Sequence, residues 1–356
     1  MNINGYIIDD SKRWKTMGGN GECNFATKDG QRYFLKRMIH LKYPLDDTEG
    51  WTDKKREEVR QRCDDWLRVH RELSEQLPGR GIGTLVKPVE YFRSGIYLYE
   101  VTHEICIAPT TYKNVYQLNQ KDRILLMMTV ARTLADVHAA GFVHADLNPE
   151  NILLSISEAG KLIGHLIDFT DSFRAKEPPE KIMSKEYWCS PEIMAYSEDH
   201  QKYREYITGK ADVFSLGIIF HQYCTQNGKG PDIKYDYPFI DVLERVAPKL
   251  DSHINPSIQK LISEMLSLEP DNRPSMEQVY KRLFYLYAGK EPSRSNLTAP
   301  IQIVAGSGKS RLGLPVSVAS LIQAVPAKVK IEFSDGSYQV MDLALAEKCG
   351  YVVRVN

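Results

Sequence analysis

One short segment in the middle of the chain restricts the fold more than any other. Residues 143–154 read VHADLNPENILL, with Asp146 five positions before Asn151. A helical pattern of apolar residues precedes the segment and an apolar β-like run closes it. A second β-like run ends at Asp168. Hard cations such as Mg²⁺ prefer carboxylate and amide oxygens, so Asn151 and Asp168 are candidate metal ligands, and Asp146 is a carboxylate that could orient a reacting hydroxyl group.

Composition restricts the class of protein further. The 356 residues are 42% hydrophobic and include 46 basic and 46 acidic side chains, which is typical of a globular protein. A formal charge of zero predicts no extended surface for nucleic acid or anionic lipid. The sequence has no long apolar run, no secretory signal and no CxxC pair among its six cysteines. We therefore expect a cytoplasmic protein without a nucleic-acid or membrane partner.

The chain changes character along its length. Up to about residue 101, short β-rich runs surround one charged helical pattern, and from 102 to about 290 helical spacing prevails. Residues 291–300 are polar and proline-flanked, which is typical of a linker. Residues 301–356 are rich in valine and isoleucine and alternate around Asp335-Gly336, so we expect a small β-rich module with a hairpin.

The central segment is one of several motifs in a fixed order. These are GNGECN at 19–24, YFLK at 33–36, DFT at 168–170, SPE at 190–192, DVFSLG at 212–217 and Arg-Pro at 273–274. Together they resemble the eukaryotic-type protein kinase domain, of the serine/threonine type, over roughly residues 4–289. The resemblance implies an α+β, bilobal fold within residues 1–290, with a β-rich N-lobe (about 1–101) and a helical C-lobe (about 102–290).

The resemblance also implies roles for matching side chains, with ATP and Mg²⁺ as cofactors. Lys36 would bind phosphate oxygens, and Asp146 would orient the hydroxyl group that attacks the γ-phosphate. Asn151 and Asp168 would hold Mg²⁺. Asn148 stands where serine/threonine kinases have a lysine that touches the γ-phosphate, so transfer would be slower unless another cation substitutes.

The walls of a nucleotide site follow from the same resemblance. The family forms its adenine ceiling from a valine and an alanine, where this chain has Ala26 and Phe34, an exchange that looks volume-conserving. Tyr99 would form the back wall, and the backbones of Glu100 and Thr102 would meet the adenine edge. The full set of expected nucleotide contacts is Gly19, Asn20, Gly21, Glu22, Ala26, Phe34, Lys36, Tyr99, Glu100 and Thr102.

Other positions are assigned structural or supporting roles. We expect Glu192 to pair with Arg273 and Asp212 to begin a large buried helix. Glu72 is the candidate for the helix glutamate that pairs with Lys36, with Glu58 as the fallback.

Two departures bear on regulation and on the acceptor. Ala145 replaces an arginine that binds a phosphorylated activation loop in many kinases, so we expect activity that does not depend on loop phosphorylation. Lys185 replaces a threonine that, in serine/threonine kinases, hydrogen-bonds the catalytic loop.

Three functions fit these motifs. The first is a protein kinase that phosphorylates serine or threonine of a protein substrate, including itself. The alternatives are a pseudokinase that acts as a nucleotide-dependent scaffold and a phosphotransferase for small molecules. By analogy with appended domains, the module at 301–356 is expected to bind a regulatory partner.

Overall fold

The computed structural model describes residues 1–9, 11, 13–17, 21–46, 50–77 and 86–289, together with the backbone of 328–332 and 338–342. The chain divides into two compact units. The first unit contains Met1–Thr110, Thr129–His144 and Glu150–Arg174; the second contains Thr111–Met128, Ala145–Pro149 and the chain from Ala175 onward. Of the helices in the described ranges, none has the length and apolar character needed to cross a membrane.

A seven-stranded antiparallel sheet forms the body of the first unit, with strand order β1-β2-β4-β5-β7-β6 and β3 beside β4. Asp29 and Gly30 have φ of 51° and 75° and join β4 to β5 in a two-residue turn, as expected for an Asp-Gly hairpin. The strands are β1 (Asn2–Ile3), β2 (Tyr6–Ile8), β3 (Lys15–Met17), β4 (Gly21–Lys28), β5 (Gln31–Lys42), β6 (Glu90–Ser94) and β7 (Tyr97–His103).

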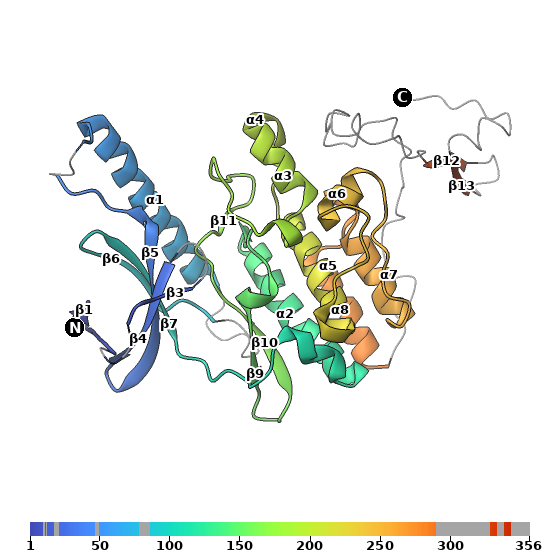
Figure 1. Ribbon diagram of the computed structural model, residues 1–356, viewed down its shortest axis with the longest axis horizontal. Helices are drawn as coiled ribbons and strands as arrows, with labels where there is room; N and C mark the ends of the chain where they lie inside the picture. Colours follow the sequence, from blue (N-terminus) through green and yellow to red (C-terminus); the bar gives the residue numbers. More distant parts are fainter. Residues whose placement is uncertain are drawn as a thin grey trace. The chain divides into compact units, whose positions relative to one another are not determined.

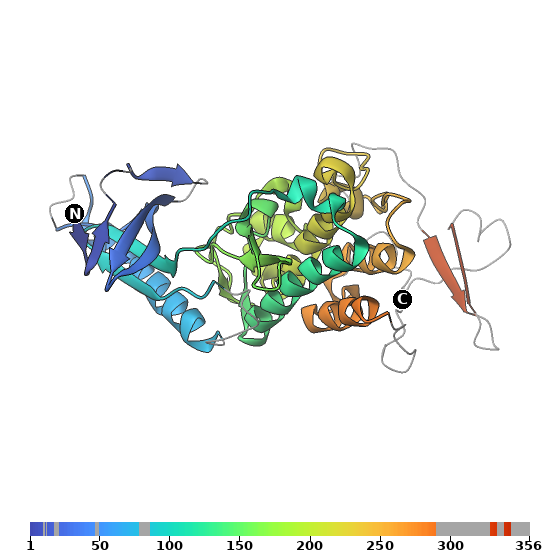
Figure 2. The ribbon, with the colours of Figure 1, turned by 90° about the horizontal axis from the view of Figure 1, so that it is seen from below.

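Helix α1 (Asp53–Gln76) covers one face of this sheet (Figure 2). Its N-terminus is capped by Thr52, whose side chain accepts a hydrogen bond from the backbone of Lys55. The α1 side chains Val59, Cys63 and Leu67 pack with Met38, Tyr91 and Leu98 of the sheet. The opposite face has its own core, made of Ile3, Tyr6, Ile8, Ala26, Tyr33, Leu35, Phe92, Tyr99 and Val101. Because side chains alternate along a strand, Lys36 of β5 lies on the α1 face.

Four short strands complete the first unit. The antiparallel pair β9 (Ile152–Ile156) and β10 (Leu162–Leu166) directly precedes Asp168. Strand β8 (Phe142–Val143) precedes β9 in the sequence and pairs with β11 (Phe173–Arg174), which follows β10. In the sequence, the ends of these strands directly flank residues 144–151 and 167–172.

The second unit is helical and is built around α5 (Lys210–Cys224) (Figure 1). Every residue of α5 from Ala211 to Tyr223 is buried. Gly217 allows the close packing of α7, because a Cβ atom there would lie 3.0 Å from Cβ of Met265. Helix α2 (Gln120–Ala139) begins in this unit, but its residues from Thr129 onward belong to the first unit. The other helices are α3 (Pro191–Glu198), α4 (His200–Tyr203), α6 (Pro238–Leu243), α7 (Pro256–Met265) and α8 (Met276–Tyr287). The 3₁₀-helices are η1 (Tyr112–Gln117), η2 (Pro149–Asn151), η3 (Glu186–Trp188), η4 (Arg204–Tyr206), η5 (Gln226–Gly228) and η6 (Pro270–Asn272).

In the C-terminal part of the chain, β12 (Lys328–Glu332) pairs antiparallel with β13 (Tyr338–Asp342). This is the pairing that the alternation around Asp335-Gly336 predicts, although that turn and the linker at 291–300 lie outside the described residues. The role of the module stays a prediction.

Candidate active site

A buried lysine and an aspartate form the centre of the site in the first unit. Lys36 is 7% exposed, and its Nζ donates hydrogen bonds to Oδ1 of Asp168 at 2.6 Å and to Oγ1 of Thr170 at 3.1 Å. Gly21 leaves room for the lysine side chain, because a Cβ atom at this position would lie 2.6 Å from Cε of Lys36. The Lys36 side chain thus passes close to the backbone of Gly21.

Charge interactions fix the protonation of this pair. Burial would raise the pKa of Asp168, but the ammonium of Lys36 and hydrogen bonds from Lys36 and Thr170 outweigh it and hold the pKa below its ordinary value. Burial would lower the pKa of Lys36, but the carboxyl groups of Asp168 and Glu100 outweigh it and raise the pKa. Asp168 also has φ of 63°, the left-handed conformation that is rare outside glycine and often marks functional turns.

Asn151 lies beside this centre. Its backbone oxygen accepts a hydrogen bond from the backbone N–H of Ile167 at 3.0 Å, so Asn151 is adjacent to the residue before Asp168. Asn151 is 8% exposed. Its amide oxygen and the carboxylate of Asp168 are oxygen donors of the kind that Mg²⁺ prefers, so the two residues fit the metal that the resemblance implies.

Glu100 is a residue of the candidate site whose side chain the sequence reasoning missed. It stands opposite Lys36 in the β5–β7 ladder, so both side chains point to the α1 face. Glu100 is 5% exposed, and its Oε2 has no hydrogen bond to any described residue. Burial raises the pKa of the Glu100 carboxyl to about 8; the charge of Asp168 adds to the shift and Lys36 opposes it. The Lys36 ammonium is therefore the counter-ion of an ionised Asp168, whereas Glu100 stays protonated at neutral pH.

The raised pKa of Glu100 predicts that stability falls as pH rises. Between the ordinary value of 4.5 and about 8, the folded chain holds one proton more than the unfolded chain, so the free energy of unfolding falls through this window. Glu100→Gln is neutral at every pH and should remove a slope of up to about 1.4 kcal/mol per pH unit. Urea unfolding at a series of pH values between 5 and 8 measures this difference. Equal slopes for both proteins would show that Glu100 is already ionised.

Helix α1 holds residues 168–170, here called the metal-binding turn after the candidate ligand Asp168, through two neutral side chains. Nε1 of Trp66 donates to the carbonyl oxygen of Thr170 at 3.0 Å, and Nε2 of His70 lies 2.9 Å from the carbonyl oxygen of Phe169. Burial lowers the pKa of His70 to about 4, so the ring is neutral at physiological pH. The rings of Trp66 and His70 stack with centroids 4.1 Å apart, one helical turn from each other.

The second unit contains residues 145–149 of the segment that resembles a kinase catalytic loop. Ala145 has φ of 71°, and its N–H donates to Oδ1 of the buried Asp212 at 2.9 Å, so α5 holds this strained backbone in place. Nδ2 of Asn148 donates to the carbonyl oxygen of Asp146 at 3.1 Å and contacts its Oδ2 at 3.4 Å. Asn148 is fully buried, so it orients the Asp146 carboxylate from below the surface.

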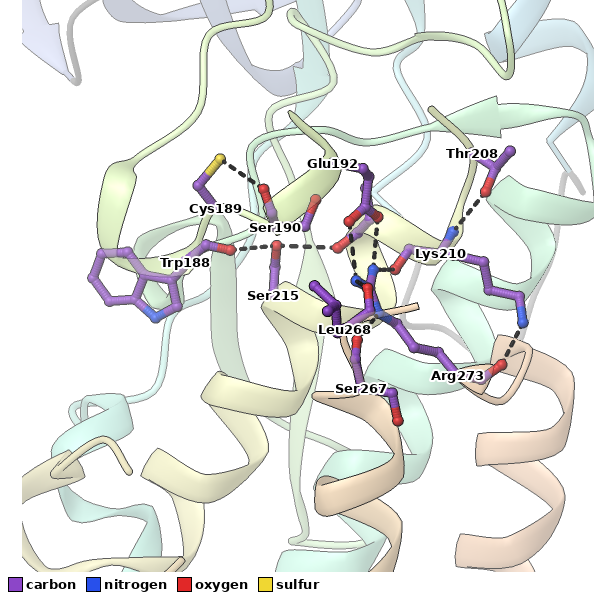
Figure 3. Close-up of polar contacts among 11 residues, drawn as sticks. Trp188, Cys189, Ser190, Glu192, Thr208, Lys210, Ser215, Ser267, Leu268 and Arg273 are labelled. Atoms are coloured by element: carbon purple, nitrogen blue, oxygen red, sulfur yellow. Dashed lines mark hydrogen bonds and ion pairs between the residues drawn. The ribbon is translucent and has the colours of Figure 1, made fainter. Parts of the chain in front are cut away.

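A buried ion pair between Glu192 and Arg273 holds the start of α3 in the second unit (Figure 3). Arg273 donates from Nη1 to Oε1 of Glu192 at 2.6 Å and from Nη2 to Oε2 at 3.0 Å, and both side chains have 0% exposure. Its remaining donors reach the carbonyl oxygens of Ser267 at 2.8 Å, Leu268 at 3.1 Å and Lys210 at 2.8 Å. Glu192 and Arg273 are thus the partners that the resemblance names.

A family model described as protein kinase domain matches residues 53–285, which is more than half of the chain. The chain belongs to the protein kinase domain family. The match begins at α1, so the first 52 residues, including Lys36, lie outside it. For these residues, the similarity to a protein kinase rests on the antiparallel sheet and on the ion pair of Lys36 with Asp168.

Curated relatives of this kinase domain are protein kinases at modest identity. It is 25% identical over 301 residues to serine/threonine-protein kinase 16 of Mus musculus, covering 78% of this chain and 92% of that protein. It is 27% identical over 195 residues to the probable serine/threonine-protein kinase roco9 of Dictyostelium discoideum, covering 54% of this chain and 5% of that protein. For Aurora kinase of Schizosaccharomyces pombe the identity is 28% over 152 residues, with 43% and 40% covered. The chain spans only 5% to 15% of roco9 and two further Dictyostelium relatives.

The structure corrects the expected adenine ceiling of the kinase domain. Ala26 pairs with Tyr33 and belongs to the core on the face away from Lys36, so it does not form the ceiling. The residue opposite Phe34 is Phe25, and the two rings meet edge to face with centroids 5.5 Å apart. The Lys36 face thus carries two phenylalanines where the family has valine and alanine, so the predicted volume compensation is wrong.

The expected back wall is also corrected. Tyr99 stacks on Phe92 in the core on the face away from Lys36, and the side chain across from Lys36 is that of Glu100. Thr102 lies opposite Phe34 on the Lys36 face. In the glycine-rich run, Glu22 is bound to Arg37, with Nε 2.8 Å from Oε2, while Gly19 and Asn20 lie outside the described residues.

The prediction that Glu72 pairs with Lys36 is wrong. Glu72 forms an ion pair with Arg174 of β11 instead, because it lies off the face that α1 packs on the sheet. Among the described residues, Lys36 makes its ion pair with Asp168, and the part of α1 that reaches the metal-binding turn carries Trp66 and His70.

This correction predicts a contrast between two substitutions in α1. Glu72→Gln should cost no more than about 1 kcal/mol, because both ends of its ion pair are partly exposed, and it should leave the phosphorylation rate unchanged. Trp66→Phe removes the N–H that holds the carbonyl oxygen of Thr170 and should lower the rate. Initial rates at saturating ATP compare the two variants. A larger loss for Glu72→Gln would restore the role first assigned to it.

Proposed function

We propose that this kinase domain transfers the γ-phosphoryl group of ATP to serine or threonine hydroxyl groups of proteins, including its own. The observation that carries this proposal is the buried pair of Lys36 and Asp168 with Asn151 beside it. An ammonium that binds phosphate oxygens and two oxygen donors for Mg²⁺ are the groups that phosphoryl transfer requires. The names of the relatives above support serine and threonine as acceptors.

Each residue has a defined task in this proposal. Lys36 would bind the phosphate oxygens of ATP, and Asn151 and Asp168 would hold Mg²⁺, which would neutralise charge on the phosphates. Asp146 accepts a hydrogen bond from the acceptor hydroxyl group and aligns it for attack. The bond from the acceptor oxygen to phosphorus forms, the bond from phosphorus to the bridging oxygen breaks, and ADP departs. The hydroxyl proton passes to Asp146.

A second candidate is a nucleotide-binding scaffold without transfer. The two phenylalanines, Phe25 and Phe34, and the absence of a glutamate partner for Lys36 among the described residues of α1 favour it. The intact set of Lys36, Asp146, Asn151 and Asp168 favours the enzyme.

One experiment separates these functions. Wild type and Asp168→Ala are incubated with labelled ATP and Mg²⁺, with generic protein acceptors and, separately, with small alcohols and aminoglycosides. We expect phosphoserine or phosphothreonine by mass spectrometry for wild type only. Mg²⁺-ATP binding without transfer would identify a scaffold, and labelling of small molecules alone would identify a small-molecule phosphotransferase.

A further inference from the structure

The catalytic loop lacks the cation that its relatives place beside the catalytic aspartate, but the next segment supplies one. Asn148 carries an uncharged amide at that position. Nζ of Lys185 donates a hydrogen bond to Oδ1 of this amide at 3.3 Å. An ammonium group therefore lies one hydrogen bond from the residue that lacks the charge, and both residues belong to the second unit.

The same lysine also contacts the catalytic aspartate through its backbone. The N–H of Lys185 donates to Oδ1 of Asp146 at 3.3 Å, while Nδ2 of Asn148 lies 3.4 Å from Oδ2. Lys185 and Asn148 thus contact both carboxylate oxygens of Asp146, and their own hydrogen bond positions the Lys185 ammonium beside it. Asn148 is fully buried, whereas Lys185 is only partly buried. The Lys185 ammonium can therefore leave the Asn148 amide and bind a ligand instead.

We propose that Lys185 is a catalytic residue whose ammonium binds the transferring γ-phosphoryl group in place of the lysine missing at Asn148. Serine/threonine kinases have a lysine at the first position and a threonine at the second. This chain has an asparagine at the first position and a lysine at the second, and the Lys185 ammonium donates a hydrogen bond to the amide oxygen of Asn148. Fixed positive charge near the equatorial oxygens stabilises the transition state. Lys185 keeps its proton throughout, since the hydroxyl proton goes to Asp146. The inference rests on the proposed function.

The test compares three changes at Lys185 with a matched control. Lys185→Met should lower kcat by about 10²-fold, as expected for loss of one group that stabilises developing charge. Lys185→Arg should retain most activity. Asn148→Lys/Lys185→Thr, which restores the arrangement of the relatives, should be at least about tenfold more active than Lys185→Met. Lys181→Met, an exposed lysine in the same segment, should match wild type.

A binding measurement makes the test independent of turnover. Lys185→Met should weaken affinity for Mg²⁺-ATP but not for Mg²⁺-ADP, because the contact is to the γ-phosphate. Thermal unfolding of each variant checks that the fold is retained. If kcat and the ATP-to-ADP affinity ratio both stay at wild-type values, Lys185 has no such role. A different result would separate the two proposals: wild type yields no phosphoprotein, but Lys185→Met still loses the preference for Mg²⁺-ATP over Mg²⁺-ADP. In that case the proposed function fails, and the contact of Lys185 with the γ-phosphate stands.

Discussion

Asp146→Asn should lower kcat by about 10²–10⁴-fold and leave the affinity for Mg²⁺-ATP almost unchanged. The asparagine side chain has nearly the same shape and can keep its hydrogen bond to the N–H of Lys185. It cannot take the proton of the acceptor hydroxyl group, so the loss should appear in the chemical step alone. Neither Asn148 nor Lys185 can replace the missing carboxylate.

Steady-state kinetics and direct nucleotide binding check this expectation. Asp236→Asn removes an exposed carboxylate from the same unit and serves as the control, with unchanged kcat. A kcat for Asp146→Asn close to that of the control would mean that another group orients the acceptor. A parallel loss of ATP affinity would mean that the substitution disturbs the site as a whole.

The second large effect concerns stability. Arg273→Met should reduce the free energy of unfolding by about 3–5 kcal/mol, because it leaves the carboxylate of Glu192 buried without a counter-ion. It also removes donors to the carbonyl oxygens of Ser267, Leu268 and Lys210, which are drawn in Figure 3. Arg273→Lys should recover only part of this loss, since an ammonium cannot reproduce the forked contact with Glu192.

Urea unfolding measures these differences. Lys281→Ala provides the comparison, because its ion pair with Glu277 has side chains 63% and 47% exposed and should contribute no more than about 0.5 kcal/mol. The double variant Arg273→Met/Glu192→Gln should be more stable than Arg273→Met alone, since no charge then remains buried. Similar losses for Arg273→Met and Lys281→Ala would contradict the argument.

The sequence predicted the parts of the site that depend on motif order. Lys36, Asn151 and Asp168 lie together in the first unit, and Glu192 pairs with Arg273 in the second. These contacts join distant positions, but each belongs to a motif whose place in the family is fixed. Local patterns also sufficed for the Asp-Gly turn and for the helices α1 and α2.

The errors came from strand register. Alignment on the glycine-rich run put Ala26 on the Lys36 face, and a shift of one residue moves a side chain to the other face of a sheet. Counting outward from the two-residue turn at Asp29-Gly30 would have paired Phe25 with Phe34 and corrected the error. The position of Glu100 required the register of β5 with β7, whose connection passes through α1 and β6, so no local turn determines it.

The contacts of α1 could not be predicted for a different reason. The periodicity of α1 already placed Glu72 off its packed face, but nothing near it in the sequence indicates Arg174, 102 positions away, as its partner. The hydrogen bonds of Trp66 and His70 end on backbone carbonyl oxygens, which every residue has. Such contacts leave no pattern of residue types in the sequence.

The way α1 is attached to the metal-binding turn has a consequence for the solution conditions that the protein tolerates. A helix joined to its neighbour by an ion pair is loosened when dissolved salt screens the charges. The indole of Trp66 and the neutral imidazole of His70 carry no net charge for an electrolyte to screen. These two hydrogen bonds should therefore keep their strength from low to high salt, whereas the ion pair of Glu72 with Arg174 should weaken.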